Sequence, residues 1–139
     1  MRKNKVQILT IEHVIDINKQ IVSQQKQKHV CLNEEKIDSA LAAAFYPGDY
    51  PFRYGGIAKV AGALCYFLTK AHAFLDGNKR TAGISATVFM GLNGYQLVYP
   101  WNIKKDTNQF AEIIDQAAAN HVSKDELIEW FDRHKKASK

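Results

Sequence analysis

Residues 56–71 are apolar over most of a helix circumference, and this constrains the rest of the chain. Ile57, Val60, Leu64 and Phe67 recur there at helical spacing. A helix that is hydrophobic nearly all round must be covered by other elements on several sides. With 139 residues, 46% of them hydrophobic, the chain has the size and mix of one compact domain. We therefore expect a single domain, 1–139, built around a central helix.

Capping residues divide the remaining chain into further helices. Thr10 and Asn33 precede two of them, the second ending at a Tyr-Pro-Gly sequence. Asp106-x-x-Gln109 opens another, and Ser123-x-x-Glu126 is a capping box for the last. A short extended piece is expected at 95–99. The expected fold is all-α, a compact bundle of about six helices.

The segment 79–93 is also predicted to be a helix, with Gly94 as its left-handed stop. Its larger apolar residues are Ile84, Val88, Phe89 and Leu92. Its opposite side carries small residues that permit close helix contact: Ala82, Gly83, Ser85 and Ala86.

The net charge of +5 is concentrated at the two ends of the chain. Residues 1–5 carry three cations and residues 133–139 carry four, with no acids in either stretch. Between them stand twelve Lys and Arg against fourteen Asp and Glu. A basic stripe along a folded face is the stronger sign of nucleic-acid binding. We therefore expect two solvated basic tails, at about 1–5 and 133–139, and contact with DNA at most indirectly, through a partner.

Other classes of protein are excluded by composition. No apolar run approaches the ~20 residues of a membrane helix, and the basic N-terminus does not lead into an apolar signal core. Cys31 and Cys65 are far apart in the sequence, which argues against a disulfide framework or a zinc cluster. The expected location is the cytoplasm.

The segment 72–81, HAFLDGNKRT, collects chemically capable side chains in one turn before a helix. His72 is the side chain there that titrates near neutrality, so it is the natural general base. Asp76 is a hard oxygen ligand suited to Mg²⁺. Gly77 lets a ligand approach the free N–H groups at the helix start, which form an anion site. Phe74 is expected to anchor the turn in the core.

Each of these residues, taken alone, also has an ordinary structural interpretation as turn chemistry or a solvated face. Lys79 and Arg80 argue against that interpretation, because two cations at a helix N-terminus oppose the helix dipole. A bound polyanion removes the conflict. The set favours phosphoryl-type transfer from a nucleotide to a hydroxyl.

The run HAFLDGNKR resembles the Fic signature H-x-F-x-[DE]-G-N-[GK]-R, and more closely that of the Doc (death-on-curing) toxin branch of the Fic/Doc superfamily. Weaker agreement extends across about 33–131. The resemblance implies a toxin of a toxin-antitoxin pair, which modifies a hydroxyl of a host protein such as elongation factor Tu. ATP or another nucleoside triphosphate would be the co-substrate, with Mg²⁺.

The resemblance also assigns roles by position. His72 would be the catalytic base and Asp76 the Mg²⁺ ligand. Gly77, Asn78 and Lys79 would supply the anion-binding turn, with the Asn78 side chain orienting the phosphates, while Lys79 and Arg80 compensate their charge. The segment 46–55 falls where the family places the flap that aligns the target.

Two departures from the broader Fic pattern favour the Doc branch and transfer of the terminal phosphoryl group. Lys79 replaces the second Gly of the signature, and Gly83 stands where adenylyl-transferring members carry a further Arg. A third departure, Ala73 for Pro, is minor. Adenylyl transfer (AMPylation) remains the alternative reaction. The alternative of a different class is a non-catalytic Fic-fold module that binds nucleotide or antitoxin and regulates transcription. His72 argues against it, because a phosphate-binding module does not require a base.

The inhibitory helix of the family, [ST]-x-x-x-E-[GN], does not occur in the sequence. An active enzyme would then need restraint from outside. The resemblance implies a separately encoded antitoxin, a segment of which folds into a groove on the toxin.

Overall fold

The computed structural model describes residues 6–46, 54–99, 101–102 and 107–138. The helices of these residues are α1 (Ile11–Gln24), α2 (Glu34–Phe45), α3 (Ile57–Ala71), α4 (Asn78–Leu92), α5 (Gln109–Ala118) and α6 (Lys124–His134). Two short antiparallel pairs accompany them, β1 (Tyr95–Leu97) with β4 (Lys135–Ala137) and β2 (Trp101–Asn102) with β3 (Thr107–Asn108). The predicted all-α class is confirmed.

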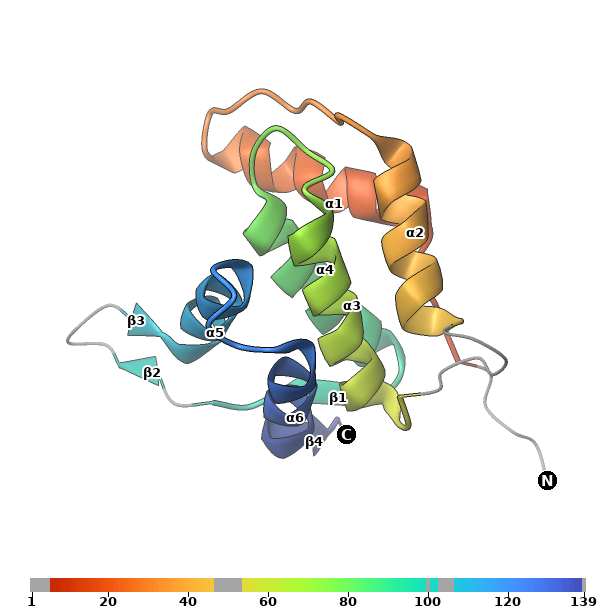
Figure 1. Ribbon diagram of the computed structural model, residues 1–139, viewed down its shortest axis with the longest axis vertical. Coiled ribbons are helices and arrows are strands. Elements are labelled where there is room, and N and C mark those ends of the chain that lie inside the picture. Colours follow the sequence, from red (N-terminus) through yellow and green to blue (C-terminus); the bar gives the residue numbers. More distant parts are fainter. Residues whose placement is uncertain (1–5, 47–53, 100, 103–106, 139) are drawn as a thin grey trace.

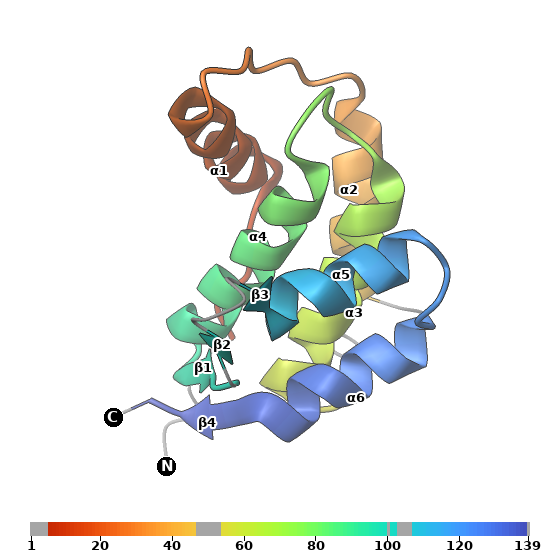
Figure 2. The ribbon, with the colours of Figure 1, turned by 90° about the vertical axis from the view of Figure 1, so that its left-hand side faces the viewer.

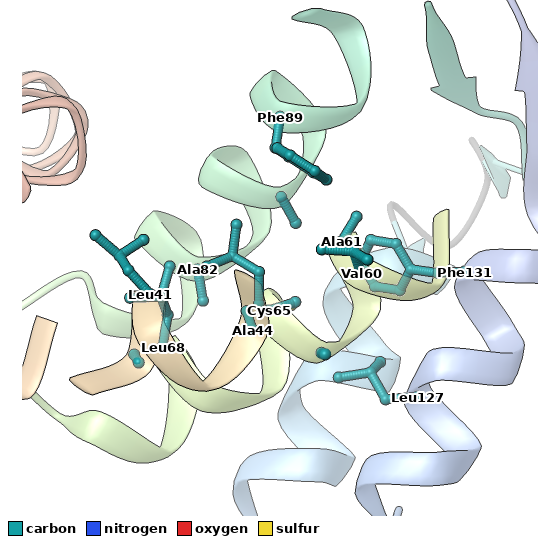
Figure 3. Close-up of a cluster of buried hydrophobic side chains, with 14 of the residues drawn as sticks. Leu41, Ala44, Val60, Ala61, Cys65, Leu68, Ala82, Phe89, Leu127 and Phe131 are labelled. Carbon is teal, nitrogen blue, oxygen red and sulfur yellow. The ribbon is translucent and has the colours of Figure 1, made fainter. Parts of the chain in front are cut away.

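α3 is the central helix, as its sequence predicts. It packs against α2, α4, α5 and α6, and Figure 1 shows it inside the bundle. Its contact with α6 is close at Gly62, where a Cβ atom would lie 2.8 Å from the Cα of Ile128. Figure 3 shows the side chains that fill this core, among them Val60 and Leu127, both fully buried. Such close-packed burial is the main stabilising term of a domain of this size.

Most predicted helix starts are confirmed by capping bonds. The Thr10 hydroxyl accepts from the His13 N–H at 3.3 Å, and Ser123 with Glu126 forms the predicted capping box. Asn33 caps α2 by accepting from the Glu35 N–H at 2.9 Å. α5 begins later than predicted, because Asn108 is its cap. Asp106, the predicted cap, lies outside the described residues.

The predicted close helix contact on the small-residue side of α4 is confirmed. Ile84, Val88 and Leu92 are 40%, 37% and 51% exposed, while the small residues on the other side are buried, together with Phe89. The reason is the close approach of α5: at Gly83 a Cβ atom would lie 2.9 Å from Cδ1 of Ile114. Small side chains let the neighbouring helices come near, and this leaves the larger apolar side chains outside.

The described part of the C-terminal basic segment, 133–138, is mostly exposed, as predicted, but it is held to the fold by backbone pairing. Arg133 and His134 complete α6, and the following residues form β4, which pairs with β1. Figure 2 shows β4 extending from the end of α6. The Val98 N–H also donates to the His134 carbonyl at 2.8 Å. The other predicted tail, 1–5, lies outside the described residues. Among the helices described, none is long and apolar enough to cross a membrane.

Candidate active site

The candidate site is built on the turn between α3 and α4. α3 ends at His72, whose backbone is left-handed with φ of 51°, and α4 begins after Gly77, with φ of 78°. Figure 1 shows this turn at one end of the molecule, beside α1. The left-handed His72 stops α3 and leaves its imidazole exposed to solvent. A non-glycine residue in this conformation carries strain, which is typical of functional positions.

The segment 29–33 holds the turn through backbone hydrogen bonds. The Ala73 carbonyl accepts from the N–H groups of Leu32 and Asn33 at 2.7 and 3.2 Å, and the Leu75 N–H donates to the Val30 carbonyl at 3.0 Å. Phe74 is 2% exposed, so its predicted role as the anchor of the turn is confirmed.

The Asn78 side chain closes the turn on itself. Its Oδ1 accepts from the Phe74 N–H at 3.0 Å, and its Nδ2 donates to the Phe74 carbonyl at 2.8 Å. The sequence analysis expected this side chain to orient phosphates. In the structure both ends of the carboxamide bond to the backbone of Phe74, so this side chain shapes the turn and has no end left free to orient a phosphate.

The start of α4 is an uncapped helix N-terminus. Gly77 stands at the N-cap position and has no side chain with which to cap the helix start. The first N–H groups of a helix have no partner within the helix, and they carry the positive end of its dipole. The N–H groups of Asn78 and Lys79 are therefore available to an anion.

A hollow of about 510 Å³ brings most of the predicted site residues together. Its wall contains His72, Asp76, Gly77, Asn78 and Lys79. Arg80 is absent from this wall and lines a second hollow, of about 550 Å³, between α4 and α5. Lys79 borders both. The geometry thus joins an imidazole, a carboxylate, a helix start and the two cations Lys70 and Lys79, and separates Arg80 from them.

The family model for the Fic/DOC family matches residues 8–90, more than half of the chain. The chain belongs to the Fic/DOC family. Its sequence is also 38% identical over 53 residues to Toxin Doc of Mycolicibacterium smegmatis, an alignment that covers 38% of this chain and 41% of that protein. The chain therefore spans less than half the length of this curated relative. The region that the family model matches, 8–90, contains the whole turn between α3 and α4.

Lys79, which follows the turn between α3 and α4, forms an ion pair with Asp115 on α5. Lys79 Nζ lies 2.9 Å from an Asp115 carboxylate oxygen, and both side chains are more than half exposed. Exposed pairs contribute less than about 1 kcal/mol. A phosphate group can therefore draw Lys79 away at small cost.

Sequence reasoning gave no role to four residues of the hollow: Thr69, Lys70, Leu75 and Ala118. Lys70 donates to the Ala118 carbonyl at 3.3 Å and to Oδ1 of Asn120, which ties the last turn of α3 to the end of α5. Its position in the last turn of a helix that ends at His72 is a signal in the sequence, because a cation is favourable there. Ala118 carries no such signal, since only the approach of α5 brings it to the wall.

The side chains of the hollow suit a Mg²⁺-nucleotide better than a metal held by protein alone. No group of three or more His, Cys, Asp or Glu gathers anywhere in the described part of the chain. Asp76 is half-buried and forms no ion pair with another described residue. Mg²⁺ in phosphate-transfer sites takes one or two carboxylates and completes its shell with phosphate oxygens and water. Asp76 beside an anion site is a donor set of that kind.

The predicted flap, 46–55, lies largely outside the described residues, which resume at Tyr54. Tyr54 packs beside α6, where the Lys124 ammonium lies 5.3 Å from the centre of its ring.

Proposed function

We propose that this chain is the toxin of a toxin-antitoxin pair, which transfers the terminal phosphoryl group of a nucleoside triphosphate to a hydroxyl of a host protein. The observation that carries the proposal is the hollow where His72 and Asp76 meet the uncapped start of α4. A base, a hard carboxylate and an anion site within one wall are the parts that phosphoryl transfer needs.

The nucleotide phosphates would bind at the start of α4. The N–H groups of Asn78 and Lys79 would donate to phosphate oxygens, and the Lys79 ammonium would exchange Asp115 for a phosphate. Asp76 would hold Mg²⁺, which neutralises charge on the phosphates when it is bound. Arg80 would act from the edge of the site, on the side of α5.

His72 would act as the general base. Its exposed imidazole at the rim of the hollow can reach a hydroxyl that arrives from solvent on another protein. The imidazole takes the proton of the hydroxyl as the oxygen forms its bond to the γ-phosphorus. The bond from that phosphorus to the bridging oxygen breaks, and the nucleoside diphosphate leaves with the electron pair.

Gly83 supports phosphoryl over adenylyl transfer. Adenylyl-transferring members of the family carry an Arg at this position, but here a Cβ atom would lie 2.9 Å from Ile114 and 3.4 Å from Phe110. The atoms that crowd this position are side-chain ends of α5, and Gly83 also borders the hollow between α4 and α5. The support therefore comes from the sequence, in which the further Arg is absent.

The proposed partners are a host protein of the elongation factor Tu kind and an antitoxin, all in the cytoplasm. The hollow between α4 and α5 supports an antitoxin that inserts an apolar helix, because its wall includes the exposed side chains of Ile84 and Val88 beside Phe110. Contact with DNA would be indirect, through that antitoxin.

The test is intact-mass spectrometry of elongation factor Tu, and of a cell lysate, after incubation with the protein, Mg²⁺ and ATP. An increment of ~80 Da supports transfer of the terminal phosphoryl group. An increment of ~329 Da would mean adenylyl transfer. The absence of any increment, with ATP still bound, would overturn the enzyme proposal in favour of a regulatory module.

A further inference from the structure

Asn18 is a fully buried polar side chain on α1, directly behind the turn of the candidate site. Its Nδ2 donates to the Asp76 carbonyl at 2.9 Å and to the Thr81 hydroxyl at 3.0 Å. Its Oδ1 lies 2.8 Å from Nδ1 of His29. One carboxamide therefore joins four segments that are distant in the sequence: α1, the 29–33 segment, the turn and α4.

The hydrogen-bond partners fix the orientation of this carboxamide. The Asp76 carbonyl can only accept, so the atom facing it is the amide nitrogen. The oxygen then faces His29, whose Nδ1 must carry a proton and donate. Neutral His29 with its proton on Nδ1 meets this requirement, and so does the protonated imidazole. The bond consequently survives a change in the charge of His29.

α1 also sets the space around Gly77. A Cβ atom there would lie 3.2 Å from Nδ2 of Asn18 and 3.2 Å from Cγ1 of Val22. The turn is thus pressed against α1 at Gly77 and bonded to it on either side, at Asp76 and Thr81. Because the peptide bond is planar and trans, holding the Asp76 carbonyl toward α1 directs the Gly77 N–H away from it.

We propose that Asn18 and Thr81 are positioning residues of the candidate site. Asn18 fixes the backbone of Asp76 and the first turn of α4 together, and so keeps the Asp76 carboxylate aligned with the free N–H groups of the helix start. Neither residue lines the hollow. They act through the groups that would touch the nucleotide, as outer-shell partners do in metal sites. The inference rests on the proposed function, since it concerns the same site.

The test compares variants of one buried hydroxyl with a matched control one turn along α4. Thr81→Val keeps the shape of the side chain and removes the acceptor for Asn18, whereas Thr81→Ser retains a hydroxyl. Ser85→Ala is the control, because Ser85 is equally buried and its hydroxyl has no partner in the part of the chain that the structure describes. We expect kcat to fall about 10-fold to 100-fold in Thr81→Val, and to stay within about threefold of wild type in Thr81→Ser and Ser85→Ala.

Asn18→Asp supplies the second variant, since it keeps the size and replaces the donor that faces the Asp76 carbonyl. Hydrogen–deuterium exchange gives a readout that does not depend on activity. We expect faster exchange at 73–78 in Asn18→Asp and Thr81→Val, and no change there in Ser85→Ala. Exchange and kcat in Thr81→Val that match those of Ser85→Ala would overturn the inference. A wild-type protein that transfers nothing, yet shows this exchange pattern, would instead contradict the proposed function and leave the positioning intact.

Discussion

The two ends of α4 share two features, a left-handed glycine and an asparagine bonded to the backbone, but only the N-terminal end forms a candidate site. A left-handed glycine stands at each end, Gly77 and Gly94, with φ of 78° and 86°. An asparagine beside each glycine bonds both ends of its carboxamide to backbone groups: Asn78 to Phe74, and Asn93 to Gln7. The glycine and the asparagine fix the direction of the chain at a helix end, and their presence alone does not indicate function.

What differs is the surroundings of the two ends. Within the described residues, no atom beyond its chain neighbours lies within 4 Å of a Cβ placed on Gly94, and the chain continues from there into β1. At Gly77 the contacts with α1 are tight, and the helix start beyond it is uncapped and faces His72 and Asp76. The two ends share their local structure, so that structure alone does not make a site. The comparison indicates that the site depends on two further features of the N-terminal end: its backbone N–H groups are free, and α1 packs against its backbone.

The largest effect is expected when the two glycines are replaced. Gly77→Ala incurs about 1–2 kcal/mol for the left-handed backbone and about 1–3 kcal/mol for crowding against Asn18 and Val22. Gly94→Ala incurs only the backbone cost. Urea unfolding should rank the two in that order, and calorimetric titration with Mg²⁺-ATP should show at least tenfold weaker binding in Gly77→Ala alone. Equal losses of stability and unchanged binding in both variants would contradict the claim that the two ends of α4 differ in packing and in nucleotide binding.

The two asparagines provide the next comparison. Asn78→Ala leaves the backbone groups of Phe74 without their partner, a loss of about 1–3 kcal/mol in the free energy of unfolding. Asn93→Ala removes a similar pair of bonds to Gln7, together with the bond from the Asn93 amide to the Phe89 carbonyl. We expect both variants to lose stability but only Asn78→Ala to lose nucleotide affinity and transfer. Loss of affinity in Asn93→Ala would show that the two ends are coupled.

The ion pair between Lys79 and Asp115 is expected to matter less. Asp115→Ala should change the free energy of unfolding by less than about 1 kcal/mol, because both partners are exposed. Since the variant leaves Lys79 free for a phosphate, its affinity for Mg²⁺-ATP should equal or exceed that of wild type. Weaker binding would mean that Asp115 helps to hold the nucleotide.

The smallest expected effect is a pH dependence from His29. Desolvation, followed by the nearby Lys19, lowers the pKa of His29 from its ordinary value of 6.5. The unfolded chain therefore binds more protons than the folded one between the two pKa values, so stability rises with pH through that window. Unfolding followed from pH 5 to pH 7.5 should show this rise, and His29→Gln should reduce it. An unchanged slope in His29→Gln would assign the dependence to another group.

Local signals in the sequence predict much of this structure. The caps at Thr10, Asn33 and Ser123, the burial of Phe74 and the central place of α3 all follow from side-chain chemistry and helical spacing. The residues that carry the candidate site, 72–80, stand together in one segment, so the turn could be found without the fold.

The features that were missed depend on contacts between distant segments. The exposed face of α4 follows from the close approach of α5 at Gly83, which hydrophobic spacing alone does not reveal. In the sequence, Asn18 is an ordinary polar residue of an amphipathic helix. It is buried because α1 packs against the turn between α3 and α4, a contact that the sequence does not indicate. Likewise, β4 exists because β1 lies beside it.

The most direct test of the account is the His72→Ala variant, studied for nucleotide binding and for growth inhibition in cells without the antitoxin. The account predicts that the variant binds Mg²⁺-ATP as wild type does, because the anion site at the start of α4 is unchanged, and that it no longer inhibits growth. A variant that remains fully toxic would contradict the assignment of His72 as the base.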